Sequence, residues 1–320
     1  MKLKAKLTQF SCRVVAVFFI ITPLAHSASE YTKLKGVSGE LHSVGSDTLG
    51  VLMKAWGKSF VKMYPAVNLQ IQSRGSSTAP RALIKQTASL APMSRKMNSR
   101  EKAAFKQKFA YEAIAIPVAM DALAVYVHKD NPIAGLTLAQ VDAIMSSTRQ
   151  CGFETDITSW DQVGLTGEWA SKAITIYGRN SLSGTHSYFR KKAMCKGLYK
   201  QTVQEHEDSR ALINDVASDV NSIGYSGMGY STQAVKRIAL STSANKPFVL
   251  AEAKTAMSGE YPLARFLYIY VNKPIAQSLG KNETEFIKMV LSNTGRKSVI
   301  KNGYIPLSKA KTAEALALLK

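Results

Sequence analysis

Three short turns rich in glycine, serine and threonine carry the residues of this sequence that are best suited to chemistry. They are Gly45–Thr48, Gly75–Thr78 and Ser181–Thr185. Each turn follows a run of strand-like composition and precedes a segment with helical periodicity. Because the first turn of a helix leaves backbone N–H groups without intrahelical partners, each turn is a candidate anion site.

Two arginines support this interpretation. Arg179 stands four residues before Ser183, and Arg95 directly follows Ser94. A guanidinium group can give two parallel, charge-assisted hydrogen bonds to a tetrahedral oxyanion. Ordinary N-capping explains any one of the turns alone. Three turns together with two arginines favour a small oxyanion held by neutral donors and guanidinium groups.

The elements that must position these turns follow an α/β pattern. Strands are predicted at residues 41–44, 68–72, 111–118, 122–128, 174–177, 223–226, 237–240 and 266–271. A helix is predicted over residues 48–63, and further helices are expected after Pro80, Thr137 and Thr185. We expect mainly parallel strands, whose carboxyl ends share one edge of a sheet, so the three turns can converge on one ligand.

Residues 1–27 are typical of a secretory signal peptide. Lysines 2, 4 and 6 and Arg13 precede the apolar run Val14–Ile21, and Ala25-His26-Ser27 offers a small-residue cleavage site. A membrane anchor is the alternative, although the run is shorter than the ~20 residues that a span needs. We expect cleavage and export to the periplasm.

The chain of 320 residues is strongly basic, with 42 Lys and Arg against 22 Asp and Glu. Cleavage would remove four basic residues and lower the formal net charge from +20 to +16. Such a charge favours anionic partners: nucleic acid, a lipid surface or a small acidic solute. The lysines are spread along the chain without a basic run interleaved with aromatics, which argues against nucleic acid.

Export would leave Cys151 and Cys195 as the two cysteines of the mature chain. In an oxidising compartment two cysteines are most simply one disulfide, and two free thiols are the alternative. A metal site at these cysteines would lack histidines at ligand spacing, so we expect no metal. We also expect no cofactor.

On these motifs, the chain resembles the phosphate-binding proteins of Pst-type ABC transporters, in the class II solute-binding superfamily. The resemblance covers roughly residues 40–310 and extends to Ile223–Ser226 and Gly303–Leu307. It implies two α/β lobes joined by two hinge crossings, with phosphate closed between them and delivered to a membrane permease. Lobe I would comprise residues 28–120 and 262–320, and lobe II residues 121–261. Proteins of this type are usually monomers.

The resemblance also assigns ligands of phosphate. The matching positions are Thr48, Leu49, Ser76, Arg179, Ser183, Gly184 and Thr185. Well-known members place an aspartate where this chain has Ser94, and that aspartate accepts the proton of hydrogen phosphate, which sulfate lacks. Here Ser94 and Arg95 would supply donors instead, and Asp47 and Asp121 are the candidate proton acceptors.

Two other functions fit part of the pattern. A binding protein for another tetrahedral oxyanion, such as sulfate, would use the same turns. A secreted phosphatase would need metal ligands or a base beside a serine, and the sequence shows neither a dense His/Asp cluster nor a paired histidine. His186, which follows the third turn, is expected on the outer face of its helix. We therefore predict no catalytic residues.

Overall fold

The computed structural model describes residues 31–320, so the predicted signal peptide at residues 1–27 lies outside the described residues. The strands are β1 Gly39–Val44, β2 Val67–Gln72, β3 Ala91–Met93, β4 Ile114–His128, β5 Gly135–Thr137, β6 Thr175–Arg179, β7 Gln204–His206, β8 Ser222–Gly227, β9 Val235–Arg237, β10 Ala239–Ser241 and β11 Ala264–Val271. The α-helices are α1 Gly50–Met63, α2 Ala79–Ile84, α3 Ser99–Phe109, α4 Leu138–Met145, α5 Gly184–Ala193, α6 Ser209–Ser218, α7 Ala253–Ser258, α8 Lys281–Leu291, α9 Asn293–Lys301 and α10 Lys309–Ala317. Short 3₁₀ turns lie at Ser76–Thr78, Asp161–Val163, Gly167–Trp169 and Met228–Tyr230.

A mixed sheet runs through the molecule in the order β3-β11-β4-β8-β6-β7, with β9 also paired to β4. Strands β11, β8 and β9 pair antiparallel with β4, and β3 pairs antiparallel with β11. The pairs β6–β7, β6–β8, β1–β2 and β5–β10 are parallel. The sheet is therefore more antiparallel than the sequence pattern predicts, because β4 and β11 run in opposite directions through its centre.

Strand β4 is one continuous strand, although the sequence pattern predicts two at residues 111–118 and 122–128. The predicted break falls at Asp121, whose carboxylate is fully buried. Asp121 pairs in register with Arg265 of β11, and the two side chains form an ion pair. The charge that suggests a loop in the sequence is thus compensated across the sheet.

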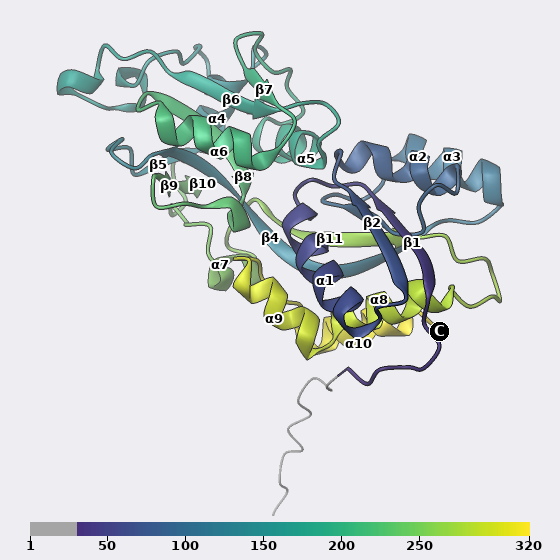
Figure 1. Cartoon of the computed structure of the whole chain (residues 1–320). Helices are drawn as coiled ribbons and strands as arrows, with labels where there is room; N and C mark the ends of the chain where they lie inside the picture. The colour runs from purple at the N-terminus through teal and green to yellow at the C-terminus, as the bar shows by residue number, and fades with distance from the viewer. Residues whose placement is uncertain (1–30) are drawn as a thin grey trace, which may run out of the picture.

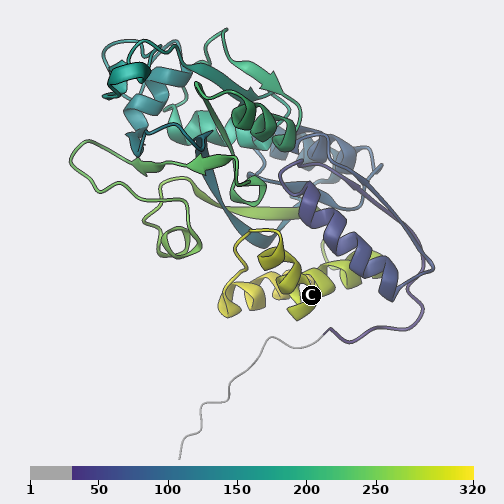
Figure 2. The same cartoon turned by 60° about the vertical axis from the view of Figure 1, so that its left-hand side comes forward.

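Hydrophobic side chains form two large cores, and β4 contributes its first half to one and its second half to the other. One core combines residues between positions 37 and 119 with residues between 267 and 319. The other is built from residues between 122 and 263, with Ile305 added. We call the halves built on these cores the first lobe and the second lobe. Figures 1 and 2 show the second lobe in teal and green beside the purple and yellow first lobe, with β4 and β11 passing between them.

Short polar signals start several helices. Asn98 and Glu101 form a reciprocal capping box at α3, and Thr137 and Gln140 form another at α4. In α1, the predicted periodicity is confirmed, since Leu52, Trp56 and Phe60 are all fully buried. Burial of one face fixes α1 against the first core and so fixes the turn that precedes it.

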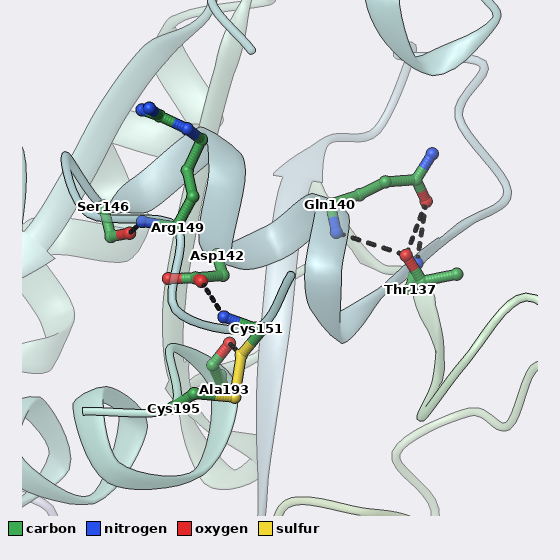
Figure 3. The surroundings of a disulfide bond; sticks show 8 residues. All are labelled: Thr137, Gln140, Asp142, Ser146, Arg149, Cys151, Ala193 and Cys195. Carbon is green, nitrogen blue, oxygen red and sulfur yellow. Dashed lines mark hydrogen bonds between the residues drawn. A yellow bond between two sulfur atoms is a disulfide. The ribbon is translucent and has the colours of Figure 1, made fainter. Parts of the chain in front are cut away.

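The predicted disulfide is confirmed between Cys151 and Cys195, whose Cα atoms are 5.3 Å apart. It joins the loop after α4 to the segment after α5, as Figure 3 shows. Buried Asp142 of α4 accepts a hydrogen bond from the N–H of Cys151 at 2.7 Å. The bridge therefore links the segment after α5 to the loop after α4 within the second lobe.

No helix within residues 31–320 has the length and apolarity to span a membrane.

Candidate anion-binding site

The first and third turns meet at the boundary between the lobes. The hydroxyl oxygens of Thr48 and Thr185 are 2.7 Å apart and share a hydrogen bond. Thr48 lies just before α1 of the first lobe, and Thr185 lies in the first turn of α5 of the second. Both residues are buried. Two hydroxyls from different lobes are therefore placed to bind one small ligand.

The second turn and the end of β3 each contribute one more buried hydroxyl. Ser76 Oγ accepts the backbone N–H of Ser94 at 3.0 Å and lies 3.2 Å from Ser94 Oγ. Gly184 of the other lobe approaches so closely that an added Cβ would lie 2.3 Å from Ser76 Oγ and 2.6 Å from Ser94 Oγ. The predicted convergence of three turns is thus present in the structure, and glycine at position 184 is required for it.

Part of the third turn serves as an ordinary helix cap. Ser183 Oγ accepts the N–H groups of Thr185 and His186 at 3.1 and 3.4 Å. The Ser183 hydroxyl can still donate its own proton. In the first turn, the N–H of Leu49 donates a long hydrogen bond of 3.4 Å to Ser46 Oγ. The capping interpretation therefore holds for the third turn, whereas the helices that follow the first and second turns have no side-chain cap.

Arg179 lies at the end of β6 and pairs across the lobe boundary with Asp47 of the first turn. Its Nη1 is 3.0 Å from Asp47 Oδ2, and the guanidinium is fully buried. Arg179 also donates to Ser209 Oγ and to the carbonyl of Glu207. Ser209 in turn donates its N–H and its hydroxyl to Asp47 at 3.0 and 2.8 Å. This cluster connects the lobes directly.

A second buried arginine lies beside the threonine hydroxyls. Arg265 of β11 donates from Nε and Nη2 to Asp121 Oδ2 at 3.1 and 2.8 Å. Nη2 also donates to Thr185 Oγ1 at 2.9 Å. Asp121 Oδ1 accepts the N–H of Met228 at 3.0 Å. Both candidate proton acceptors, Asp47 and Asp121, are therefore ion-paired with buried arginines.

Arg95 takes a different place from that expected of a ligand. Its guanidinium forms two hydrogen bonds of 2.7 Å with Glu101, the capping glutamate of α3. It also donates to Ser77 Oγ at 3.1 Å. Arg95 thus contacts the second turn and the start of α3, both within the first lobe.

Two tyrosines support the first turn. Tyr230 donates to the carbonyl of Asp47 at 2.9 Å, and Tyr304 donates to the carbonyl of Thr48 at 2.7 Å. Burial is the main cause that raises the pKa of both phenols, and the charge of Asp47 adds to it. Both side chains therefore stay protonated donors and hold the backbone around Thr48.

His186 does not face outward as the sequence suggests. Its ring stacks on Tyr199 with centroids 4.4 Å apart. Burial, together with the positive charges of Arg190 and Arg179, lowers the pKa of His186 to about 4. His186 is thus a neutral residue of α5 that packs on Tyr199.

Several residues of this site are absent from the sequence-based prediction, among them Arg265, Ser209, Tyr230 and Tyr304. A signal for Arg265 does exist in the sequence. It is the one charged residue in the strand Ala264–Val271, just as Asp121 is the one charged residue in Ile114–His128 apart from the terminal histidine. A charge inside an apolar strand calls for a partner, because an unpaired buried charge is strongly destabilising.

Other features lie apart from the site. A groove of about 1020 Å³ opens between residues 31–34 and helices α8, α9 and α10, and none of the predicted ligands lines it. Within residues 31–320, no cluster of three or more His, Cys, Asp or Glu side chains is arranged to hold a metal ion.

Comparison of the sequence with known proteins identifies its family. The sequence profile described as PBP superfamily domain matches residues 31–294. The phosphate-binding protein PstS of Pseudomonas aeruginosa is 50% identical over 313 residues, which cover 98% of this chain and 96% of that protein. The chain belongs to the PstS family of phosphate-binding proteins. Protein SphX of Synechococcus elongatus is a more distant relative, 28% identical over 92% of this chain and 86% of its own length.

Solved structures show the same two-lobed fold. A protein of Clostridium perfringens with bound phosphate matches 84% of this chain and 100% of its own, with a TM-score of 0.70 and 24% identity. An ABC-type phosphate transport receptor of Vibrio cholerae matches 83% of this chain and 100% of its own, with a TM-score of 0.63 and 21% identity. At this identity, the likeness establishes the fold, and the PstS relative establishes the family.

Proposed function

We propose that this protein captures inorganic phosphate between its two lobes and delivers it to an ABC-type permease. The observation that carries the proposal is the meeting of the Thr48 and Thr185 hydroxyls, one from each lobe, at 2.7 Å. A bound oxyanion would accept both O–H groups and so replace their mutual hydrogen bond. The membership in the PstS family supports phosphate as the oxyanion.

Around this point we assign the ligands. Thr48, Ser76, Ser94, Ser183 and Thr185 would donate hydroxyl hydrogen bonds, and Leu49 and Gly184 would donate backbone N–H groups. Arg179 would supply positive charge at the lobe boundary. Arg95 would act on the second turn through Ser77 and Glu101, since its guanidinium is bonded to both.

Closure of the lobes would couple binding to transport. A ligand that bridges both lobes binds the closed conformation better than the open one, and this difference in affinity drives the hinge. We place the hinge crossings in β4 and β11, with lobe I at residues 28–120 and 262–320 and lobe II at residues 121–261. The change of core along β4, between Ala119 and Ala122, supports this division.

Selection of phosphate over sulfate requires an acceptor for the proton of hydrogen phosphate. Asp47 and Asp121 are both engaged by arginines, and each carboxylate has further lone pairs. The hydroxyl of Ser94 is a third acceptor, because a serine oxygen both donates and accepts. Binding of another tetrahedral oxyanion is the alternative outcome.

The remaining parts of the proposal concern the setting. The predicted signal peptide and the disulfide fit an exported, periplasmic protein. We propose that it works as a monomer that binds no nucleic acid, needs no cofactor and has no catalytic activity. Absence of p-nitrophenyl phosphate turnover would separate it from a secreted phosphatase.

The test is isothermal titration of the mature chain after unfolding and refolding to strip ligand. One-to-one phosphate binding that excess sulfate does not displace is the expected result. Sulfate bound as tightly as phosphate would keep the site but refute the choice of ligand. No binding of either oxyanion would refute the function.

A further inference from the structure

Arg265 has an unused donor beside the threonine hydroxyls. The residue is only 5% exposed, and its Nη1 has no hydrogen-bond partner within the described part of the chain. A buried donor left without a partner is destabilising, because it has lost its hydrogen bonds to water. Its other nitrogens, Nε and Nη2, are satisfied by Asp121 and Thr185. The arrangement leaves one side of the guanidinium fork free.

The position of this free side follows from the contacts of the guanidinium. Nη1 shares the carbon Cζ with Nη2, and Nη2 donates to the Thr185 hydroxyl at 2.9 Å. That hydroxyl bonds to Thr48 across the lobe boundary. Tyr188, one helical turn after Thr185, covers the guanidinium with its ring 5.1 Å from Cζ. The fork is therefore held next to the point where the two lobes meet.

The other buried arginine of the site, Arg179, is more fully engaged. Four of its contacts go to Asp47, Ser209 and the carbonyls of His206 and Glu207. Arg179 has five N–H groups in all. Arg265, in contrast, keeps both N–H groups of Nη1 without an acceptor among residues 31–320.

We propose that Arg265 is a second guanidinium ligand of the bound oxyanion and that Asp121 holds it in position. The inference rests on the proposed function, because it names a further residue of the same site. The ion pair with Asp121 compensates the charge of the buried arginine. It also orients the fork, so that Nη1 faces the ligand that Thr48 and Thr185 bind.

A set of variants separates a ligand role from a structural role. Asp121→Asn and the double variant Asp121→Asn/Arg265→Gln carry the same amide at position 121, so their difference isolates Arg265. We expect the double variant to bind phosphate roughly 10- to 100-fold more weakly than Asp121→Asn, as for loss of a hydrogen bond to a charged group. Arg296→Gln, which removes a bond to the carbonyl of Leu307 remote from the site, is the control and should leave the affinity unchanged.

Equal phosphate affinity of the parent, Asp121→Asn and the double variant would overturn the proposal. If the two variants bind equally but more weakly than the parent, the crystal structure of the parent with phosphate decides whether Arg265 contacts the ligand. If either variant fails to fold, a crystal structure of the parent with phosphate decides: Nη1 within ~3.5 Å of a phosphate oxygen supports the proposal, and a longer distance refutes it. A parent protein that binds no phosphate would refute the proposed function itself. A parent that binds while Arg265 contributes nothing would refute this inference alone.

Discussion

Replacement of Gly184 by alanine should block phosphate binding without unfolding the protein. Gly184 is the first residue of α5, where alanine is well tolerated by the helix. The substitution keeps the backbone N–H and the Ser183 cap. It adds only a methyl group, which points at the second turn of the other lobe.

The magnitude follows from the distances. The new Cβ would lie 2.3 Å from Ser76 Oγ, 2.6 Å from Ser94 Oγ and 2.7 Å from Ser76 Cβ, whereas real Cβ atoms keep at least 3.0 Å. Rotation of the Ser76 hydroxyl cannot relieve the 2.7 Å contact with Ser76 Cβ, so the lobes must separate by at least about 0.3 Å, and by about 0.7 Å to reach the 3.4 Å of ordinary van der Waals contact. The larger movement would bring the Ser77 N–H···O Leu182 bond of 3.1 Å beyond the ~3.5 Å limit.

A phosphate bridging the lobes would then lose ligands on one side. Loss of two hydrogen bonds to a charged group, at about 1.5 kcal/mol each, gives about 3 kcal/mol, or at least ~100-fold weaker binding. Titration calorimetry measures the affinity, and differential scanning calorimetry without phosphate measures the stability. Gly50→Ala is a matched control, because Gly50 is the first residue of α1 as Gly184 is of α5. Its added Cβ would lie 2.9 Å from Ser73 Oγ, which belongs to the same lobe and can rotate away.

Gly184→Ala with unchanged phosphate affinity would refute the reasoning, since it would mean that ligand binding does not require the approach of Gly184 to Ser76. A loss of affinity equal in Gly184→Ala and Gly50→Ala would also contradict it. Weak binding accompanied by a large loss of thermal stability in Gly184→Ala alone would point to a folding defect in α5 and not to blocked closure.

Three further predictions test stability. Replacing Cys151 and Cys195 together by alanine should lower the unfolding free energy by about 4 kcal/mol, from the 44-residue separation, while phosphate affinity measured by calorimetry stays within a few-fold; a small change in denaturant midpoint would argue against it. Because burial lowers the pKa of His186 to about 4 from 6.5, the unfolded chain binds the extra proton between these pH values. Stability should thus be full above pH 6.5 and fall by up to about 3 kcal/mol as pH drops to 4, and urea titrations of His186→Gln should show a flatter profile. Tyr304→Phe should lower the unfolding free energy by about 1–2 kcal/mol, since it leaves the buried carbonyl of Thr48 without its donor, and an unchanged urea midpoint would refute this.

The parts of the fold that local sequence governs were predictable. Helix α1 follows from apolar residues at helical spacing, and the capping boxes at Asn98 and Thr137 follow from residue types three positions apart. The pairing of Cys151 with Cys195 follows from their number once the signal peptide is recognised. The three turns follow from their glycines and hydroxyls. Each of these signals is read within one segment of chain.

The sequence by itself therefore determined which residue types could bind an oxyanion, but the tertiary structure decided their partners. Asp47 meets Ser209 across 162 positions, and Asp121 meets Arg265 across 144. Which charges pair at such separation depends on the register of β4 with β11 and on how closely the lobes approach. Arg95 forms its hydrogen bonds with Glu101, six positions away, because the capping box places that carboxylate at the start of α3. A buried charge must be compensated, and only the packed chain shows which group compensates it.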